Sequence, residues 1–247
     1  SGEAEDVLDV FRSGKDIYIE QARLILGKQD ISKDERQTFG KVPVLALGYQ
    51  GGVNAFQAMA RNYGVTLPDQ QADEIKTMWR KANPWAVRFW ADAEDAATRA
   101  ILRPNEPQRA GRLHYVYVPT LLRGTLLCML PSGRFIAYPE ARVHTQHGLV
   151  FLHPTYGPST TYGGALVQGA TQGEAATLLR EALVKCDSAG LNAVLQVHDE
   201  LVVDGAADGL QEIMEFVPAW AAGLPLAAET ESGPRYKVKT HDVSEAI

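Results

Sequence analysis

Two adjacent carboxylates stand at a predicted β-turn near the carboxyl end of the chain. The segment Gln196-Val197-His198-Asp199-Glu200-Leu201-Val202-Val203 places Asp199 and Glu200 between two apolar, strand-like pieces. A carboxylate at a hairpin tip is held rigidly and is reachable by solvent, which suits a hard divalent cation. An ordinary charged turn is the alternative, since Asp is a favoured turn residue.

A second group of candidate residues lies in the first quarter of the chain. Lys41, Leu45 and Tyr49 recur every four residues, so on a helix they share one face. A cation, an apolar residue and an aromatic ring in this order could meet phosphate, sugar and base in turn. The alternative is a surface lysine beside two core residues.

The elements that must position these residues can be read from the hydrophobic pattern. Apolar residues at helical spacing predict helices early in the chain, among them one that opens with the Ser32–Glu35 capping-box pattern and runs to about Tyr49. We expect helices over 54–63 and 68–102, the latter kinked or split by Pro84. Strands are expected over 113–118, 125–130, 134–138, 193–197 and 201–203, with further helices over 170–187 and 207–221. The fold class is therefore α+β.

Read together, the two candidate groups resemble motifs B and C of the family A, or polymerase I-like, DNA polymerases. The family has an Arg, then a Lys, then Tyr-Gly on a fingers helix, and a His-Asp-Glu hairpin in the palm. Over nearly its whole length the chain resembles the phage branch of this family. The segments that carry this resemblance are Gly40-Lys41-Val42, Leu45-Ala46-Leu47-Gly48-Tyr49-Gln50-Gly51-Gly52, Leu130-Pro131-Ser132-Gly133-Arg134, Tyr138-Pro139 and Tyr162-Gly163-Gly164.

The resemblance implies a domain plan and an activity. Residues 1–110 would be the fingers helices, with the nucleotide-binding helix at about 33–50. Residues 111–160 would be a strand-rich insertion, and residues 161–247 a partial palm of the antiparallel-sheet, right-hand fold. The activity implied is that of a DNA-directed DNA polymerase, in which the primer 3'-hydroxyl attacks the α-phosphorus of a dNTP.

The resemblance also assigns residue roles. Lys41 would bind the triphosphate, Leu45 would lie near the sugar, and Tyr49 would stack near the template base. Asp199 would hold Mg²⁺, with Glu200 near the metal. DNA contacts are implied for His198 near the primer terminus, for Gln172, and for Tyr49.

Three departures from the family pattern limit the expected activity. The palm motif that supplies the second aspartate for a two-Mg²⁺ site has no match, so we expect it upstream of Ser1 and expect little activity from the chain alone. Arg36 stands five residues before Lys41, where the family has four and where Gln37 stands here. A local bulge would be needed to return Arg36 to the nucleotide face, and with it Arg36 is a nucleotide-binding candidate. The DNA-facing Asn of phage relatives is replaced by Gly169.

Several interpretations of the missing motif stay open. The chain can be a fragment, the product of a truncated gene, or one half of a split polymerase whose upstream half supplies the motif and the thumb. A non-catalytic nucleic-acid-binding remnant is the alternative from another class. A single-subunit RNA polymerase is a third, which Glu200 disfavours because those enzymes usually have His-Asp-Ser at the palm hairpin.

Charge and composition are compatible with a nucleic-acid partner for the first part only. The net charge is −6, and residues 1–150 hold 19 Lys+Arg against 17 Asp+Glu, whereas residues 151–247 hold 5 against 13. Cys128 and Cys186 are expected to be reduced thiols. No apolar run is long enough for a membrane helix, and no signal-like start is visible. We therefore expect a cytoplasmic location.

Overall fold

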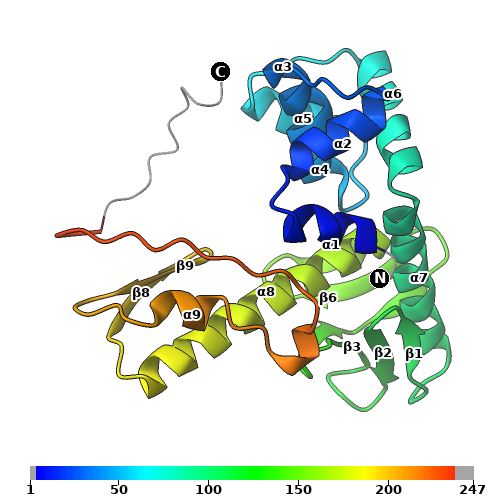
Figure 1. The fold of residues 1–247 in the computed structure, drawn as a ribbon. Coiled ribbons are helices and arrows are strands. Elements are labelled where there is room, and N and C mark those ends of the chain that lie inside the picture. Colours follow the sequence, from blue (N-terminus) through cyan, green and yellow to red (C-terminus); the bar gives the residue numbers. More distant parts are fainter. Residues whose placement is uncertain (1–3, 237–247) are drawn as a thin grey trace. The chain divides into compact units, whose positions relative to one another are not determined.

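The computed structural model describes residues 4–236. The chain divides into two compact units, Ser1–Thr171 and Gln172–Ile247, and the division falls inside helix α8 (Gly163–Ser188). The predicted α+β class is confirmed, with helices first and antiparallel sheets later (Figure 1).

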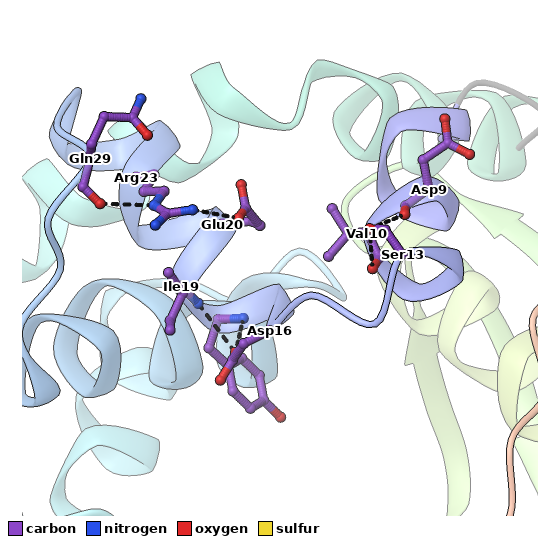
Figure 2. A network of polar contacts seen from close by, with 9 residues as sticks. Asp9, Val10, Ser13, Asp16, Ile19, Glu20, Arg23 and Gln29 are labelled. Carbon is purple, nitrogen blue, oxygen red and sulfur yellow. Dashed lines mark hydrogen bonds and ion pairs between the residues drawn. The ribbon is translucent and has the colours of Figure 1, made fainter.

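Helices make up the first hundred residues. Local signals set several of their ends. Asp16 caps α2, and its side chain accepts hydrogen bonds from the backbone N–H of Tyr18 and Ile19 (Figure 2). Gly27 ends α2 in the left-handed conformation. The predicted capping box of Ser32 and Glu35 is present. The elements are α1 (Glu5–Arg12), α2 (Ile17–Leu26), α3 (Lys33–Glu35), η1 (Arg36–Lys41), α4 (Val42–Leu47), α5 (Val53–Asn62), α6 (Asp69–Ala82) and α7 (Pro84–Leu102).

The long helical stretch after residue 68 is split at Pro84, as predicted. Pro84 is the first residue of α7, where its missing N–H is no loss. Trp79 and Trp90 are buried core residues that stack with their ring centroids 6.0 Å apart, and Trp85 packs at the edge of the same core. α7 also contacts the first two strands of the sheet that follows.

Two antiparallel sheets follow α7 in the first unit. Three predicted strands, β2 (Leu113–Val118), β3 (Thr125–Met129) and β4 (Phe135–Pro139), form a meander with the expected turn at 131–133, and β1 (Gln108–Ala110), which was not predicted, pairs with β2 at its edge. A second meander, of β5 (Arg142–His144), β6 (Gly148–His153) and β7 (Gly157–Thr161), was not predicted. β5 has only three residues and β7 contains no large apolar side chain, so neither shows an apolar alternation, and the apolar run Leu149–Leu152 of β6 was not recognised as a strand.

The second unit contains most of α8, the hairpin of β8 (Ala193–Val197) and β9 (Glu200–Val203), α9 (Leu210–Met214) and the 3₁₀ turn η2 (Ala219–Ala221). The prediction of one helix over 207–221 is wrong, because α9 ends after five residues and extended Pro218 precedes η2. The helix predicted from about residue 170 begins seven residues earlier, at Gly163. Within residues 4–236, Cys128 and Cys186 form no disulfide, and both are buried.

Within the described residues, no helix is both long and apolar enough to cross a membrane.

Candidate nucleotide-binding helix and carboxylate hairpin

The helix that carries Lys41 contains the bulge that Arg36 required. Residues Arg36–Lys41 form a π-helical segment, in which the backbone N–H of Val42 donates to the carbonyl of Gln37 five residues earlier. Because an i→i+5 turn accommodates one extra residue, Arg36 and Lys41 return to the same side of the helix. A five-residue spacing that fails on an α-helix therefore works here.

Both cations lie against tyrosine rings from other segments. Arg36 Nε donates to Asp16 Oδ2 at 2.7 Å, and the guanidinium lies 5.0 Å from the centroid of the Tyr18 ring. Lys41 Nζ lies 4.8 Å from the centroid of the Tyr63 ring. Burial raises the pKa of Tyr18, and the neighbouring Tyr63 and Asp16 raise it further while Arg36 lowers it. These residues thus form one electrostatic neighbourhood, which we call the arginine–lysine cluster.

A glycine inside the π-helical segment lets α2 approach. Gly40 is buried, and a Cβ there would overlap the carbonyl oxygen of Tyr18. The close approach fixes the start of α2 against the helix that bears Arg36 and Lys41. The Gly-Lys pair of the sequence motif therefore combines a packing residue with a charged one.

Leu45 and Tyr49 lie at and just beyond the end of this helix. α4 ends at Leu47, two residues earlier than predicted, so Tyr49 stands in the following turn. Leu45 is 38% exposed, whereas Tyr49 is partly buried against the core. An exposed apolar side chain and an adjacent aromatic ring suit contact with a sugar and a base.

The loop after Tyr49 is clamped by α7 and by the first residues of α8. The Gly164 N–H donates to Gln50 Oε1 at 2.8 Å, and the Trp90 indole donates to the Gly48 carbonyl at 3.1 Å. A Cβ at Gly164 would overlap the Tyr49 carbonyl oxygen. The Tyr-Gly-Gly motif at 162–164 is thus required for close packing beneath Tyr49.

A hollow of about 430 Å³ adjoins this clamp. Gln50, Arg80, Trp90 and Glu94 are among its lining residues, and Arg80 also donates to the Gly51 carbonyl at 3.2 Å. None of these residues was singled out from the sequence as a site residue. The relation of Arg80, Trp90 and Glu94 to Tyr49 depends on packing between segments that lie thirty or more residues apart, for which the sequence carries no local signal.

The predicted carboxylate hairpin is present in the second unit. β8 and β9 pair antiparallel, with Val197 opposite Glu200, so His198 and Asp199 form the tip. Both tip residues are exposed, and His198 has a positive φ of 52°. Glu200 lies on β9 instead, where its Oε2 accepts a hydrogen bond from the Tyr236 hydroxyl at 3.0 Å. This hydrogen bond raises the pKa of Tyr236.

Comparison with known proteins places the chain among polymerases. Over 205 residues, or 77% of its length, it is 36% identical to the DNA polymerase of Bacillus phage SP02. The chain is homologous to part of a phage-type, polymerase I-like DNA polymerase. It is also 24% identical, over 94% of its length, to the DNA polymerase I of Pseudomonas aeruginosa. The polymerase homologue spans 31% and 22% of these two relatives, and no protein-family model matches it.

Asp199 is the residue of the polymerase homologue that the resemblance assigns to Mg²⁺. Within residues 4–236, no three His, Cys, Asp or Glu side chains gather into a possible metal site. Asp199 is a single exposed carboxylate, and its neighbour Glu200 is bound to Tyr236. A hard cation prefers several oxygen ligands, of which Asp199 can supply one.

Two further positions were expected to bear on DNA binding, Gln172 and Gly169. Gln172 is an exposed residue of α8 at the start of the second unit, and Gly169 faces β4, since a Cβ there would lie 3.4 Å from the Tyr138 hydroxyl. The arginine–lysine cluster belongs to the first unit and Asp199 to the second.

Proposed function

We propose that the chain is the fingers and partial palm of a DNA-directed DNA polymerase that adds dNTPs to a primer 3' end. The arrangement of Arg36 and Lys41 on one side of a π-helical segment carries this proposal. Residues 1–110 are the fingers, 111–160 the strand-rich insertion, and 161–247 the partial palm. The identity to a phage DNA polymerase supports the assignment.

The chain's own residues bind and orient the substrates. Lys41 and Arg36 contact the triphosphate oxygens, and Leu45 and Tyr49 contact the sugar and base. His198 and Gln172 contact primer–template DNA, and Asp199, with Glu200 near it, is the carboxylate that would hold Mg²⁺. When bound, two Mg²⁺ ions stabilise the attacking and leaving oxygens of the in-line displacement.

The second carboxylate for such a site is supplied, in this proposal, by an upstream polymerase half. The chain alone is then inactive or nearly so, because Asp199 cannot clamp two cations. Purified chain supplied with primed template, dNTPs and Mg²⁺ should give no measurable primer extension. Robust extension by the chain alone would refute the proposed division of the active site.

Nucleotide binding tests directly the roles proposed for Arg36 and Lys41. Titration of the chain with a fluorescent dNTP should give saturable binding that Lys41→Ala weakens by at least about tenfold, as expected for loss of a charge-assisted phosphate contact. Arg36→Ala should weaken binding too, because the π-helical segment returns Arg36 to the side of Lys41. Lys33→Ala, on the same helical stretch but outside the cluster, is the matched control. Unchanged affinity in Lys41→Ala contradicts the proposal.

A non-catalytic nucleic-acid-binding remnant is the second candidate. Two observations favour it: the lone Asp199 and the packing of Gly169 towards β4, where phage relatives place a polar residue. Such a remnant binds DNA but has no need for dNTP affinity, so the same titration separates the two functions.

A further inference from the structure

Two turns of the β5–β6–β7 sheet share one sequence pattern, His-x-x-aromatic-Gly. Turn 144–148 reads His-Thr-Gln-His-Gly, and turn 153–157 reads His-Pro-Thr-Tyr-Gly. In each, the histidine pairs with the glycine across the ladder, and the glycine has a positive φ, 65° at Gly148 and 72° at Gly157. Both are therefore three-residue hairpin loops closed by a left-handed glycine.

Each turn also fixes an aromatic pair. His144 Nδ1 accepts the backbone N–H of Gln146 at 3.2 Å, and its ring stacks on His147 with centroids 4.7 Å apart. His153 Nδ1 likewise accepts the N–H of Thr155 at 3.1 Å, and its ring stacks on Tyr156 at 4.6 Å. With Nδ1 accepting, each neutral imidazole carries its proton on Nε2, where it can donate to a phosphate oxygen.

The two aromatic pairs differ in the side of the sheet from which they extend. Because strand side chains alternate, His144 shares a side with Arg142, whereas His153 shares the opposite side with Phe151. Phe151 packs edge-on against the buried Tyr138 ring at 5.2 Å, so its side faces the core. We call the opposite side the outer face; its residues are Arg142, His144, Val150, Leu152, Pro158 and Thr160.

The outer face lies in a stretch without carboxylates. No Asp or Glu occurs between Glu140 and Glu174, in a chain that holds 30 of them. Arg142 donates to the Glu140 carbonyl at 3.4 Å, while the Glu140 carboxylate pairs with Arg123 at 3.3 Å. Four of the six outer-face residues are exposed. A polyanion that approaches the outer face therefore meets no carboxylate carried by β5, β6 or β7.

We propose that this outer face binds single-stranded DNA. Arg142 contacts phosphate, the His144–His147 pair offers a ring for a base to stack on, and the exposed Leu152 and Pro158 contact sugars and bases. Stacking on a fixed aromatic ring suits unpaired bases, because a duplex has its bases already stacked. DNA is also the partner in the proposed polymerase function, on which this inference rests for its biological setting, but the residues are different.

The test compares the two turns as matched variants. His144→Asn with His147→Ser keeps a side-chain acceptor for the Gln146 N–H but removes both outer rings. His153→Asn with Tyr156→Ser makes the same change in the turn of the opposite side. Fluorescence anisotropy with a labelled oligonucleotide of about 16 nucleotides should show affinity about tenfold weaker for the first variant and changed less than about twofold for the second.

Two further readouts separate the contacts. Arg142→Ala should reduce the slope of log affinity against log salt by about 0.7, the value for one phosphate contact on a single strand. A duplex of the same sequence should lose less affinity in the His144→Asn, His147→Ser variant than the single strand does. Circular dichroism checks that all variants are folded.

Several results would overturn the proposal: no binding of single strands by the unmodified chain, unchanged affinity in the first variant, or equal losses in both turns. An equal loss for duplex and single strand would also overturn it, since stacking would then not explain the effect. The dNTP titration is the separate test of the polymerase assignment, and the turn variants should leave it unchanged. Either proposal can therefore fail without the other.

Discussion

Asp16 divides its two carboxylate oxygens between a helix and an arginine. Oδ1 accepts from the backbone N–H of Tyr18 and Ile19 at 2.8 and 3.2 Å, and Oδ2 accepts from Arg36 Nε at 2.7 Å. The carboxylate that starts α2 thus also fixes one of the two cations assigned to the triphosphate. Helix position and cation position are coupled through one side chain.

Substitutions at Asp16 should separate the cap from the ion pair. Asp16→Asn keeps an acceptor for the cap but loses the ion pair, and because both partners are about a third exposed the loss should be only about 0.5 kcal/mol. Asp16→Ala loses both and should destabilise by about 1.5 kcal/mol. Urea unfolding measures both values, and equal losses would show that the cap contributes nothing.

The same residue predicts a dependence of stability on pH. Burial raises the pKa of Asp16, but the hydrogen bonds from Arg36, Tyr18 and Ile19 outweigh it, and the pKa lies below its ordinary value of 3.8. A lowered carboxyl pKa stabilises the folded state above 3.8 and loses this effect as pH falls through the folded value. The stability difference between the unmodified chain and Asp16→Asn should therefore be constant above about pH 5 and shrink below pH 3.8. A difference that grows on acidification contradicts the ion pair.

Gly40→Ala should be among the most disruptive single-methyl additions in the chain. The new Cβ would overlap the Tyr18 carbonyl, a backbone atom that cannot move without displacing α2. We expect a loss of about 3 kcal/mol by urea unfolding. Gly52→Ala is the control, because a methyl group there would have no other atom within 4 Å and the φ of Gly52 is −90°. The control should change stability by less than about 1 kcal/mol, and similar losses in the two variants would argue against the close approach.

Gly169→Ala, in contrast, should stabilise the protein. Gly169 lies inside α8, and its Cβ would be 3.4 Å from the Tyr138 hydroxyl, which is ordinary contact. Replacing a glycine in a helix interior by alanine stabilises by roughly 0.5–1 kcal/mol. Thermal unfolding of the variant checks this, and a destabilised variant would mean that β4 leaves no room for a methyl group.

Much of the site's scaffold could be predicted because its signals are local. The Ser32–Glu35 capping box, the break at Pro84 and the hairpin tip at Asp199 each depend on a few neighbouring residues. Even the π-helical segment has a local signal, since the five-residue spacing of Arg36 and Lys41 fits one face only with an inserted residue.

The rest depends on contacts between distant segments. Nothing near Arg36 in sequence indicates Asp16, and nothing near Tyr49 indicates Gly164. The start of α8 was missed because Gly163, Gly164 and Gly169 are poor helix formers, and tertiary packing against α7 and the Tyr49 loop outweighs that preference. Propensity alone could not predict these relationships.

The pKa of the Tyr236 hydroxyl should depend on the presence of the Glu200 carboxylate. The hydrogen bond to Glu200, with some burial and the charge of that carboxylate, raises the pKa of Tyr236 above its ordinary value of 10.0. A raised tyrosine pKa means that the stabilising bond is fully present below pH 10.0 and is lost as pH rises through the folded value. In Glu200→Ala, ring-carbon NMR of labelled tyrosine should report a lower Tyr236 pKa. Glu229→Ala, which alters an exposed Glu of the same unit, should leave it unchanged. If Tyr236 titrates identically in all three proteins, the hydrogen bond between the Tyr236 hydroxyl and Glu200 is contradicted.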